Sequence, residues 1–144
     1  MDEIRFSVLH KKDLKGKEYV ELRPGKHRKK KFHQSSIYIP TEVFLMFKGL
    51  IWEKYREYSP TTTNAISSHD WLRILDGLNE FLQVANTDMT IEQLKEALYV
   101  RPHQELPKYE DFASFRDDII GLIKEMDQWV RETTQSESYV SICI

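Results

Sequence analysis

Residues 40–58 carry the densest hydrophobic pattern of the chain, and its spacing is helical. In PTEVFLMFKGLIWEKYREY the apolar side chains recur every three or four residues, and further apolar residues beside them make the first three turns hydrophobic almost all round. A helix of this kind is buried rather than half-exposed. We therefore expect a central helix from Pro40 to Tyr58, started by the proline. Trp52 lies in the apolar pattern and, like the other two tryptophans, is expected in the core.

Alternation of apolar and polar residues predicts three strands before this helix. The first covers about 7 residues around positions 4–8. The second covers residues 19–23 and the third residues 32–39, with a turn at Pro24-Gly25 between them. Three successive strands joined in this way form an antiparallel meander.

Two helices are expected after the central one. A polar loop over residues 61–65 precedes a helix that has Ser68 as its N-cap and extends to about Ala85. Thr90 and Gln93 then have the spacing of a capping box, which predicts a short helix ending before residue 101.

The longest predicted helix and a final strand complete the chain. The helix runs from about Glu110 to Thr133, and its inward stripe is made by Phe112, Phe115, Ile119, Leu122, Met126 and Trp129. Residues 138–144 alternate like a strand, with Val140, Ile142 and Ile144 on one side, and are expected to pair with the meander. The predicted fold class is α+β, with a small antiparallel sheet packed against about four helices.

The composition fits one domain with its charges divided along the chain. The 144 residues include 40% hydrophobic residues and one cysteine, which excludes an internal disulfide. We expect a single domain over 1–144, with a basic meander (1–39), a helical part (40–135) and the final strand (138–144). Residues 1–31 hold eleven Lys/Arg and five Asp/Glu, a balance of +6, whereas residues 32–144 hold ten and eighteen, a balance of −8. No segment resembles a signal peptide or a membrane span, so a cytoplasmic protein without a membrane partner is expected.

A basic run follows the Pro24-Gly25 turn. It could follow a phosphate backbone, with an aromatic ring for stacking, through Lys26, Arg28, Lys29, Lys30, Lys31 and Phe32. The competing interpretation is an ordinary loop tip, where lysines are tolerated and discourage edge-to-edge pairing of sheets. The acidic overall balance favours the second interpretation.

An acidic ladder on the last predicted helix is the stronger candidate site. Asp111, Asp118, Glu125 and Glu132 are seven residues apart, with Glu110 and Asp117 beside them. A solvated helix face usually pairs its acids with Lys or Arg three or four positions away. Of these acids only Asp111 has such a neighbour, Lys108, and the polar face also contains a glycine, Gly121, that permits close approach by another backbone. The ladder either faces the basic hairpin of the same chain or recognises a cationic partner.

Catalytic and metal chemistry find little support in the sequence. The five histidines lack the spacing of a metal site, and the five glycines form no phosphate-binding loop. His69 beside Asp70 is typical of a helix start, and Cys143 lies in an apolar alternation that favours a packed thiol. We expect no enzyme, no metal and no cofactor.

In size, charge and absence of catalytic motifs, the chain resembles the small single-domain immunity proteins with which bacteria neutralise their own toxins. The resemblance covers the layout of the whole chain and transfers no individual residue. It implies a non-enzymatic protein that binds and neutralises a cationic toxin domain through an acidic helical surface. A nucleic-acid-associated regulator that uses the basic hairpin is the alternative, and an enzyme of unrecognised type is the third hypothesis.

Overall fold

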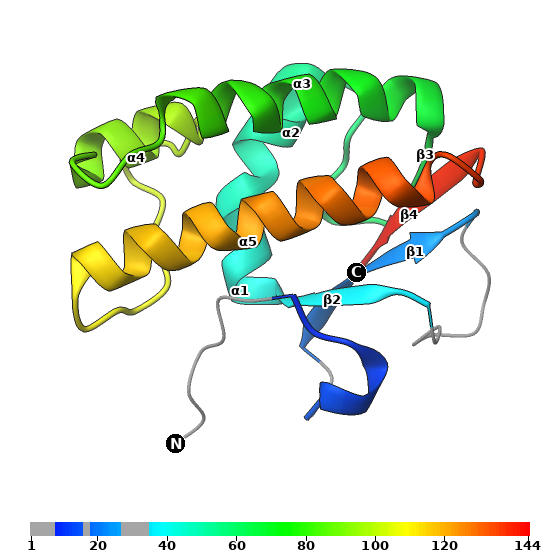
Figure 1. Cartoon of the computed structure of the whole chain (residues 1–144), viewed down its shortest axis with the longest axis horizontal. Coiled ribbons are helices and arrows are strands. Elements are labelled where there is room, and N and C mark those ends of the chain that lie inside the picture. Colours follow the sequence, from blue (N-terminus) through cyan, green and yellow to red (C-terminus); the bar gives the residue numbers. More distant parts are fainter. Residues whose placement is uncertain (1–7, 16–17, 27–34) are drawn as a thin grey trace.

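A four-stranded antiparallel sheet and a layer of helices make up the fold (Figure 1). The computed structural model describes residues 8–15, 18–26 and 35–144. The strands are β1 (Tyr19–Pro24), β2 (Ile37–Pro40), β3 (Asn64–Ser67) and β4 (Tyr139–Cys143), in the spatial order β2-β1-β4-β3. The α+β fold class predicted from the sequence is confirmed.

The sheet buries one apolar face against the helices. The register places Leu22 of β1 opposite Ile37 of β2 and opposite Ile142 of β4, while Ile66 of β3 lies opposite Val140. Because alternate residues of a strand point to opposite faces, these side chains share one face, and all five belong to the main hydrophobic core. The sheet therefore forms the floor of that core.

The other face of the sheet is buried and polar. It carries six side chains, each at most 5% exposed: Glu21, Arg23, Ser36, Tyr38, Ser141 and Cys143. The Ser36 hydroxyl donates to Glu21 Oε2 at 2.6 Å, and the Ser141 hydroxyl donates to the Gly25 carbonyl at 2.8 Å. Hydrogen bonds of this kind make the burial of polar groups tolerable.

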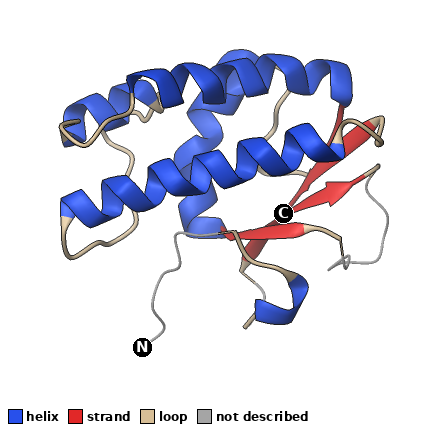
Figure 2. Cartoon of the chain, in the orientation of Figure 1, coloured by secondary structure: helices blue, strands red, loops and turns tan. Residues whose placement is uncertain are grey.

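The helices cover the apolar face as a second layer (Figure 2). They are α1 (Thr41–Phe44), α2 (Lys48–Lys54), α3 (Ser68–Val84), α4 (Ile91–Ala97) and α5 (Phe112–Thr133), with short 3₁₀ turns at Lys11–Asp13 and Leu45–Phe47. Figure 1 shows α3 and α5 running antiparallel, with α2 crossing behind them and α4 at the end of the layer away from the sheet. In the part of the chain that the structure describes, no helix combines the length and apolar character needed to cross a bilayer.

The single helix expected over residues 40–58 is interrupted in the structure, so that prediction is wrong. The 3₁₀ turn at Leu45–Phe47 separates α1 from α2, and α2 ends at Lys54. A 3₁₀ residue turns about 120° instead of about 100°, so three of them rotate the following residues by about 60° relative to α1. Phe44, Phe47 and Ile51 remain buried, but Trp52 is 42% exposed. The expectation that Trp52 lies in the core is therefore corrected.

The caps of the other helices follow the sequence signals closely. Thr90 and Gln93 form the predicted capping box, with reciprocal hydrogen bonds of 2.9 and 3.2 Å. The N-cap of α3 is Ser67 rather than Ser68, because the Ser67 hydroxyl accepts from the Asp70 amide at 3.1 Å. The N-cap of α5 is Asp111, so that helix begins two residues later than expected.

Two strand assignments need correction, and the first predicted strand lies almost entirely outside the described residues. In the first predicted strand, residues 4–7 lie outside the described residues. The residue that follows this strand, Leu9, forms a β-bridge with Tyr38 of β2 through two hydrogen bonds of 2.9 Å, whereas the predicted meander would pair this region with β1. The third predicted strand begins within residues 32–34, which are also outside the described part, and β2 starts at Ile37. The polar loop predicted over residues 61–65 instead leads into β3, which pairs with β4.

The last strand pairs with the N-terminal part of the sheet as predicted, and it lies inside the sheet. β4 has β1 on one side and β3 on the other. The Trp71 indole nitrogen, from α3, donates to the Val140 carbonyl at 3.0 Å and ties the strand to the helical layer. Ile144 is 47% exposed and falls beyond the strand, so it does not join Val140 and Ile142 in the core.

Candidate functional site on the last helix

Helix α5 separates an apolar stripe from a charged face. Four residues of the predicted stripe, Phe115, Ile119, Leu122 and Met126, are each at most 2% exposed and pack inward, and Val130 joins them. The other two predicted members, Phe112 and Trp129, are only partly buried against the core. This packing fixes the rotation of the helix about its axis. The face opposite the stripe is consequently held toward solvent.

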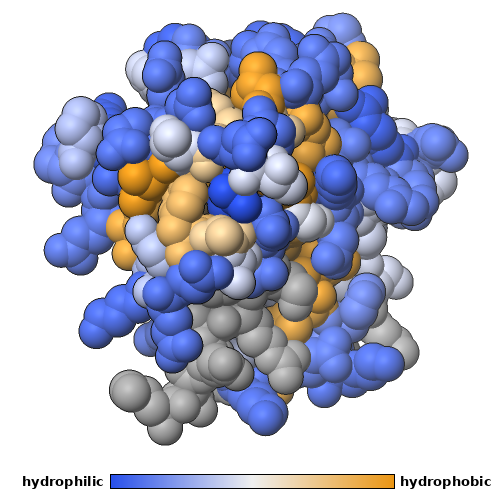
Figure 3. All heavy atoms as spheres, turned by 60° about the vertical axis from the view of Figure 1, so that its left-hand side comes forward, coloured by the Kyte–Doolittle hydropathy of each residue, from blue (hydrophilic) through white to orange (hydrophobic). Residues whose placement is uncertain are grey.

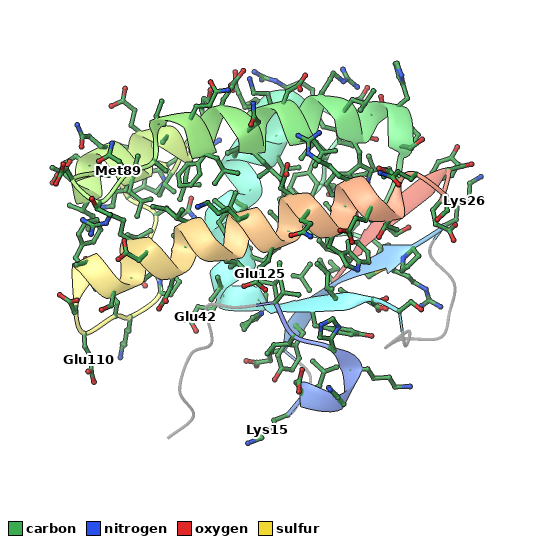
Figure 4. All side chains as sticks on the ribbon, in the orientation of Figure 1. Lys15, Lys26, Glu42, Met89, Glu110 and Glu125 are labelled. Atoms are coloured by element: carbon green, nitrogen blue, oxygen red, sulfur yellow. The ribbon has the colours of Figure 1, made fainter. Side chains whose placement is uncertain are left out.

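All six residues of the acidic ladder are exposed: Glu110, Asp111, Asp117, Asp118, Glu125 and Glu132. Figure 4 shows Glu125 projecting from the middle of α5 and Glu110 at its N-terminal approach. Residues 110–133 contain seven acids and three bases. The basic side chains of the internal interpretation, Lys29 to Lys31, lie outside the described residues.

Three members of the ladder have partners on their own helix. The carboxylate of Asp111 accepts hydrogen bonds from the Ser114 hydroxyl at 2.8 Å and the Ser114 amide at 3.0 Å, and these bonds lower the pKa of Asp111. Glu132 accepts from the side-chain amide of Gln128 at 3.0 Å. Asp117 pairs with Arg116 at 3.2 Å. Asp117 has no basic residue three or four positions away, as the sequence indicates, but the long Arg116 side chain reaches it from the adjacent position.

Asp118 and Glu125 differ from these three. Within the described residues, neither carboxylate takes part in an ion pair or a side-chain hydrogen bond, since Arg116 is held by Asp117 and Arg131 by Asp127 at 3.0 Å. Both carboxylates are exposed, and among the described residues no basic side chain lies within ion-pair distance of either.

Gly121 lies between these two carboxylates on the same face, three residues after Asp118 and four before Glu125. A Cβ atom built at Gly121 would meet no atom of the described chain within 4 Å. The glycine is thus not required by internal packing, although a glycine inside a helix costs about 1 kcal/mol relative to alanine. We call Asp118, Gly121 and Glu125 the open acidic patch.

The basic run is represented in the described residues by Lys26 alone. This residue is exposed, and its Nζ lies 4.6 Å from the centroid of the Tyr139 ring. The remaining candidates of the run, Arg28 to Phe32, are outside the described part of the chain. The nucleic-acid hypothesis stays a prediction.

Sequence reasoning missed two cavities that share one residue, Tyr99. One of about 480 Å³ lies between α3 and α4 and has an apolar lining that includes Phe81, Val84 and Met89. Figure 3, which brings the α4 end forward, shows patches of apolar surface within a mainly hydrophilic face. The other cavity, of about 560 Å³, lies between α2 and the segment after α4 and is lined by Trp52 and several polar residues. The absence of Gly or Asn at the end of α4 is the sequence signal that could have drawn attention to Tyr99.

Cys143 is buried, as its apolar context predicted, and burial raises the pKa of its thiol to about 12. Such a thiol is protonated at neutral pH and is a poor nucleophile. Among the described residues, no three His, Cys, Asp or Glu side chains gather where they could hold a metal ion.

Comparison of the chain with protein-family models, with curated proteins and with solved structures gives no match.

Proposed function

We propose that this chain is a non-enzymatic protein-binding module whose helix α5 receives a cationic partner protein. The observation that carries the proposal is the open acidic patch, in which two exposed carboxylates without an ion pair among the described residues flank a glycine whose Cβ position is open space. In the more specific form of the proposal, the chain is an immunity protein and the partner is a toxin domain.

The electrostatics of the patch suit recognition of a positively charged surface. Two unit charges 4 Å apart attract by about 1 kcal/mol in bulk water and by about 4 kcal/mol at the effective dielectric constant near a protein surface. Asp118 and Glu125 form no ion pair among the described residues, so a partner gains this attraction without first breaking one. Exposed charges of one sign also accelerate encounter.

Gly121 adds a steric reason for a partner at this position. Because glycine has no Cβ, no side chain covers the helix backbone between the two carboxylates, and another backbone can approach it closely. A glycine inside a long helix destabilises the free protein, so a gain made only in a complex would explain its presence.

The test compares two double charge reversals that change the net charge equally. Asp118→Lys with Glu125→Lys alters the patch, whereas Asp76→Lys with Asp88→Lys alters two exposed acids on and just after α3. A partner is first captured from a lysate of the native cell, and its association rate with each purified variant is then measured between about 50 and 200 mM salt.

The patch reversal is expected to slow association at least about tenfold at low salt and to flatten its salt dependence, because exposed charges act mainly on the association rate. The Asp76/Asp88 reversal should change the rate much less. Equal effects of the two reversals on the association rate would show that only the net charge matters, and would contradict the proposal. A drop in melting temperature of roughly 10 °C for the patch reversal alone would also contradict it, since the carboxylates would then stabilise the fold itself.

A further inference from the structure

The cavity between α2 and the segment after α4 has the size of a ligand site. Its volume of about 560 Å³ lies within the range of small-molecule pockets, which is about 300–1,000 Å³. We call this cavity the aromatic groove. Its lining includes Lys48, Gly49, Trp52, Tyr99, Arg101 and His103. It lies apart from the open acidic patch and does not depend on the function proposed above.

Tyr99 occupies a backbone position that normally requires glycine. Helix α4 ends in a Schellman motif, in which the Tyr99 amide donates to the Glu96 carbonyl at 3.1 Å and the Val100 amide to the Lys95 carbonyl at 2.8 Å. The residue in this position has a left-handed backbone, and Tyr99 has φ +58°. An L-residue there is strained relative to glycine. The fold would accept glycine at this position with less strain.

Burial does not explain the tyrosine either. Tyr99 is 43% exposed, and it lines both the aromatic groove and the cavity between α3 and α4. A strained backbone position that carries an exposed aromatic ring is a reason to look for a ligand.

Gly49 fixes the strained residue against α2. A Cβ atom at Gly49 would collide with the carbonyl oxygen of Tyr99, so only glycine lets the two backbones approach this closely. Trp52 lies three residues further along α2 and therefore near the same face. The close approach thus sets Tyr99 and Trp52 as two walls of one groove.

Trp52 is 42% exposed and is held in place by Arg56. The Arg56 guanidinium lies 3.8 Å from the centroid of the Trp52 ring and also pairs with Glu53 at 3.1 Å. Arg56 therefore orients the indole and neutralises Glu53, the acid among the groove residues.

The remaining charges of the groove are positive. Lys48 and Arg101 line it and make no ion pair within the described part of the chain, and His103 supplies a third nitrogen donor. Arg and Lys are the side chains that bind phosphate, and exposed aromatic rings stack on planar bases.

We propose that the aromatic groove binds a nucleoside monophosphate. The base stacks against Tyr99 and Trp52, and the phosphate is held by Lys48 and Arg101. The proposal requires the base and the phosphate to bind together, because the groove combines aromatic walls, which suit a base, with cations, which suit a phosphate.

The test is a titration of the intact protein with AMP, adenosine and inorganic phosphate, followed by calorimetry and by tryptophan fluorescence. AMP is expected to bind with a Kd below about 1 mM, and adenosine and phosphate at least about tenfold more weakly. Equal binding of phosphate and AMP would reduce the groove to a cationic patch and overturn the proposal. Absence of AMP binding, or binding of a single-stranded oligonucleotide without binding of AMP, would overturn it as well.

Two variants locate the binding. Tyr99→Gly removes the ring and relieves the backbone, so it should melt at or above the temperature of the parent while AMP affinity falls about tenfold. Lys48→Gln with Arg101→Gln should lower the affinity similarly, whereas Lys108→Gln with Lys124→Gln, an equal change of charge at exposed positions elsewhere, should not. Unchanged affinity in Tyr99→Gly, or a marked loss of its stability, would assign the tyrosine to packing and contradict the proposal.

Discussion

Replacing Ile142 with alanine tests whether the core depends on the inner position of β4. Ile142 is fully buried and lies opposite Leu22 of β1 and Asn64 of β3. Truncation of a buried isoleucine to alanine costs about 2–5 kcal/mol, the transfer of its methyl and methylene groups plus the cavity that remains. We expect about 3 kcal/mol here, because neighbours on both sides limit the collapse of the cavity.

The matched control is Ile144→Ala. Ile144 is 47% exposed and lies one residue beyond the strand, so its loss should change the free energy of unfolding by no more than about 0.5 kcal/mol. Both variants lose the same atoms, and only the position relative to the sheet differs.

Urea unfolding, followed by circular dichroism, measures the difference. With a slope of about 1–3 kcal/mol per molar urea, the Ile142 variant should unfold at a midpoint lower by about 1–3 M, with its slope unchanged. In a thermal melt the same loss corresponds to roughly 10 °C. Ile142→Ala and Ile144→Ala variants of equal stability would refute the assignment of β4 to the interior of the sheet.

Two further predictions concern α5 and the core tyrosine. Gly121→Ala should raise the free energy of unfolding by up to about 1 kcal/mol, because a Cβ fits there without contact. The same variant should bind the captured partner more weakly, and stronger binding would contradict a close approach at Gly121. Burial raises the pKa of the Tyr58 phenol to about 12, so between pH 10 and 12 the unfolded state loses this proton while the folded state keeps it, and stability falls as the pH rises. Urea midpoints measured across this range should fall less steeply in Tyr58→Phe, and identical slopes in the two proteins would show that Tyr58 is not the group responsible.

The parts of the fold that the sequence predicted are those in which local pattern and tertiary packing agree. The stripe of α5 repeats over five turns and leaves one possible inward face, and the reciprocal bonds of Thr90 and Gln93 are entirely local. The alternation around Val140 and Ile142 likewise identified β4.

The errors arose where a distant part of the chain, or a local turn that no residue pattern marks, decides the structure. β3 has four residues with a single buried side chain, Ile66, and becomes a strand because β4 supplies its hydrogen-bond partner. Trp52 shares the apolar composition of its segment, but the 3₁₀ turn before it changes its direction, and no sequence signal marks that turn.

The candidate sites divide in the same way. The acidic ladder could be found because charge and helical spacing are both visible in the sequence. Its internal pairing was less predictable, since the contact of Asp117 with Arg116 joins adjacent residues that a simple helical projection separates. The aromatic groove could not be found, because it depends on the meeting of Gly49 with the Tyr99 carbonyl across two helices.

The place of β4 between β1 and β3 has a consequence for the order of folding. Glu21 pairs with Cys143 across nearly the whole sequence, and β1 and β3 have no hydrogen bonds to each other in the observed strand order. Until β4 has been synthesised, the ribosome-bound chain therefore presents two unsatisfied strand edges, and closing the sheet requires contacts of very long sequence separation. Such contacts slow folding, and open edges attract other chains. In this architecture the sheet is therefore completed late, by the strand that joins β1 to β3.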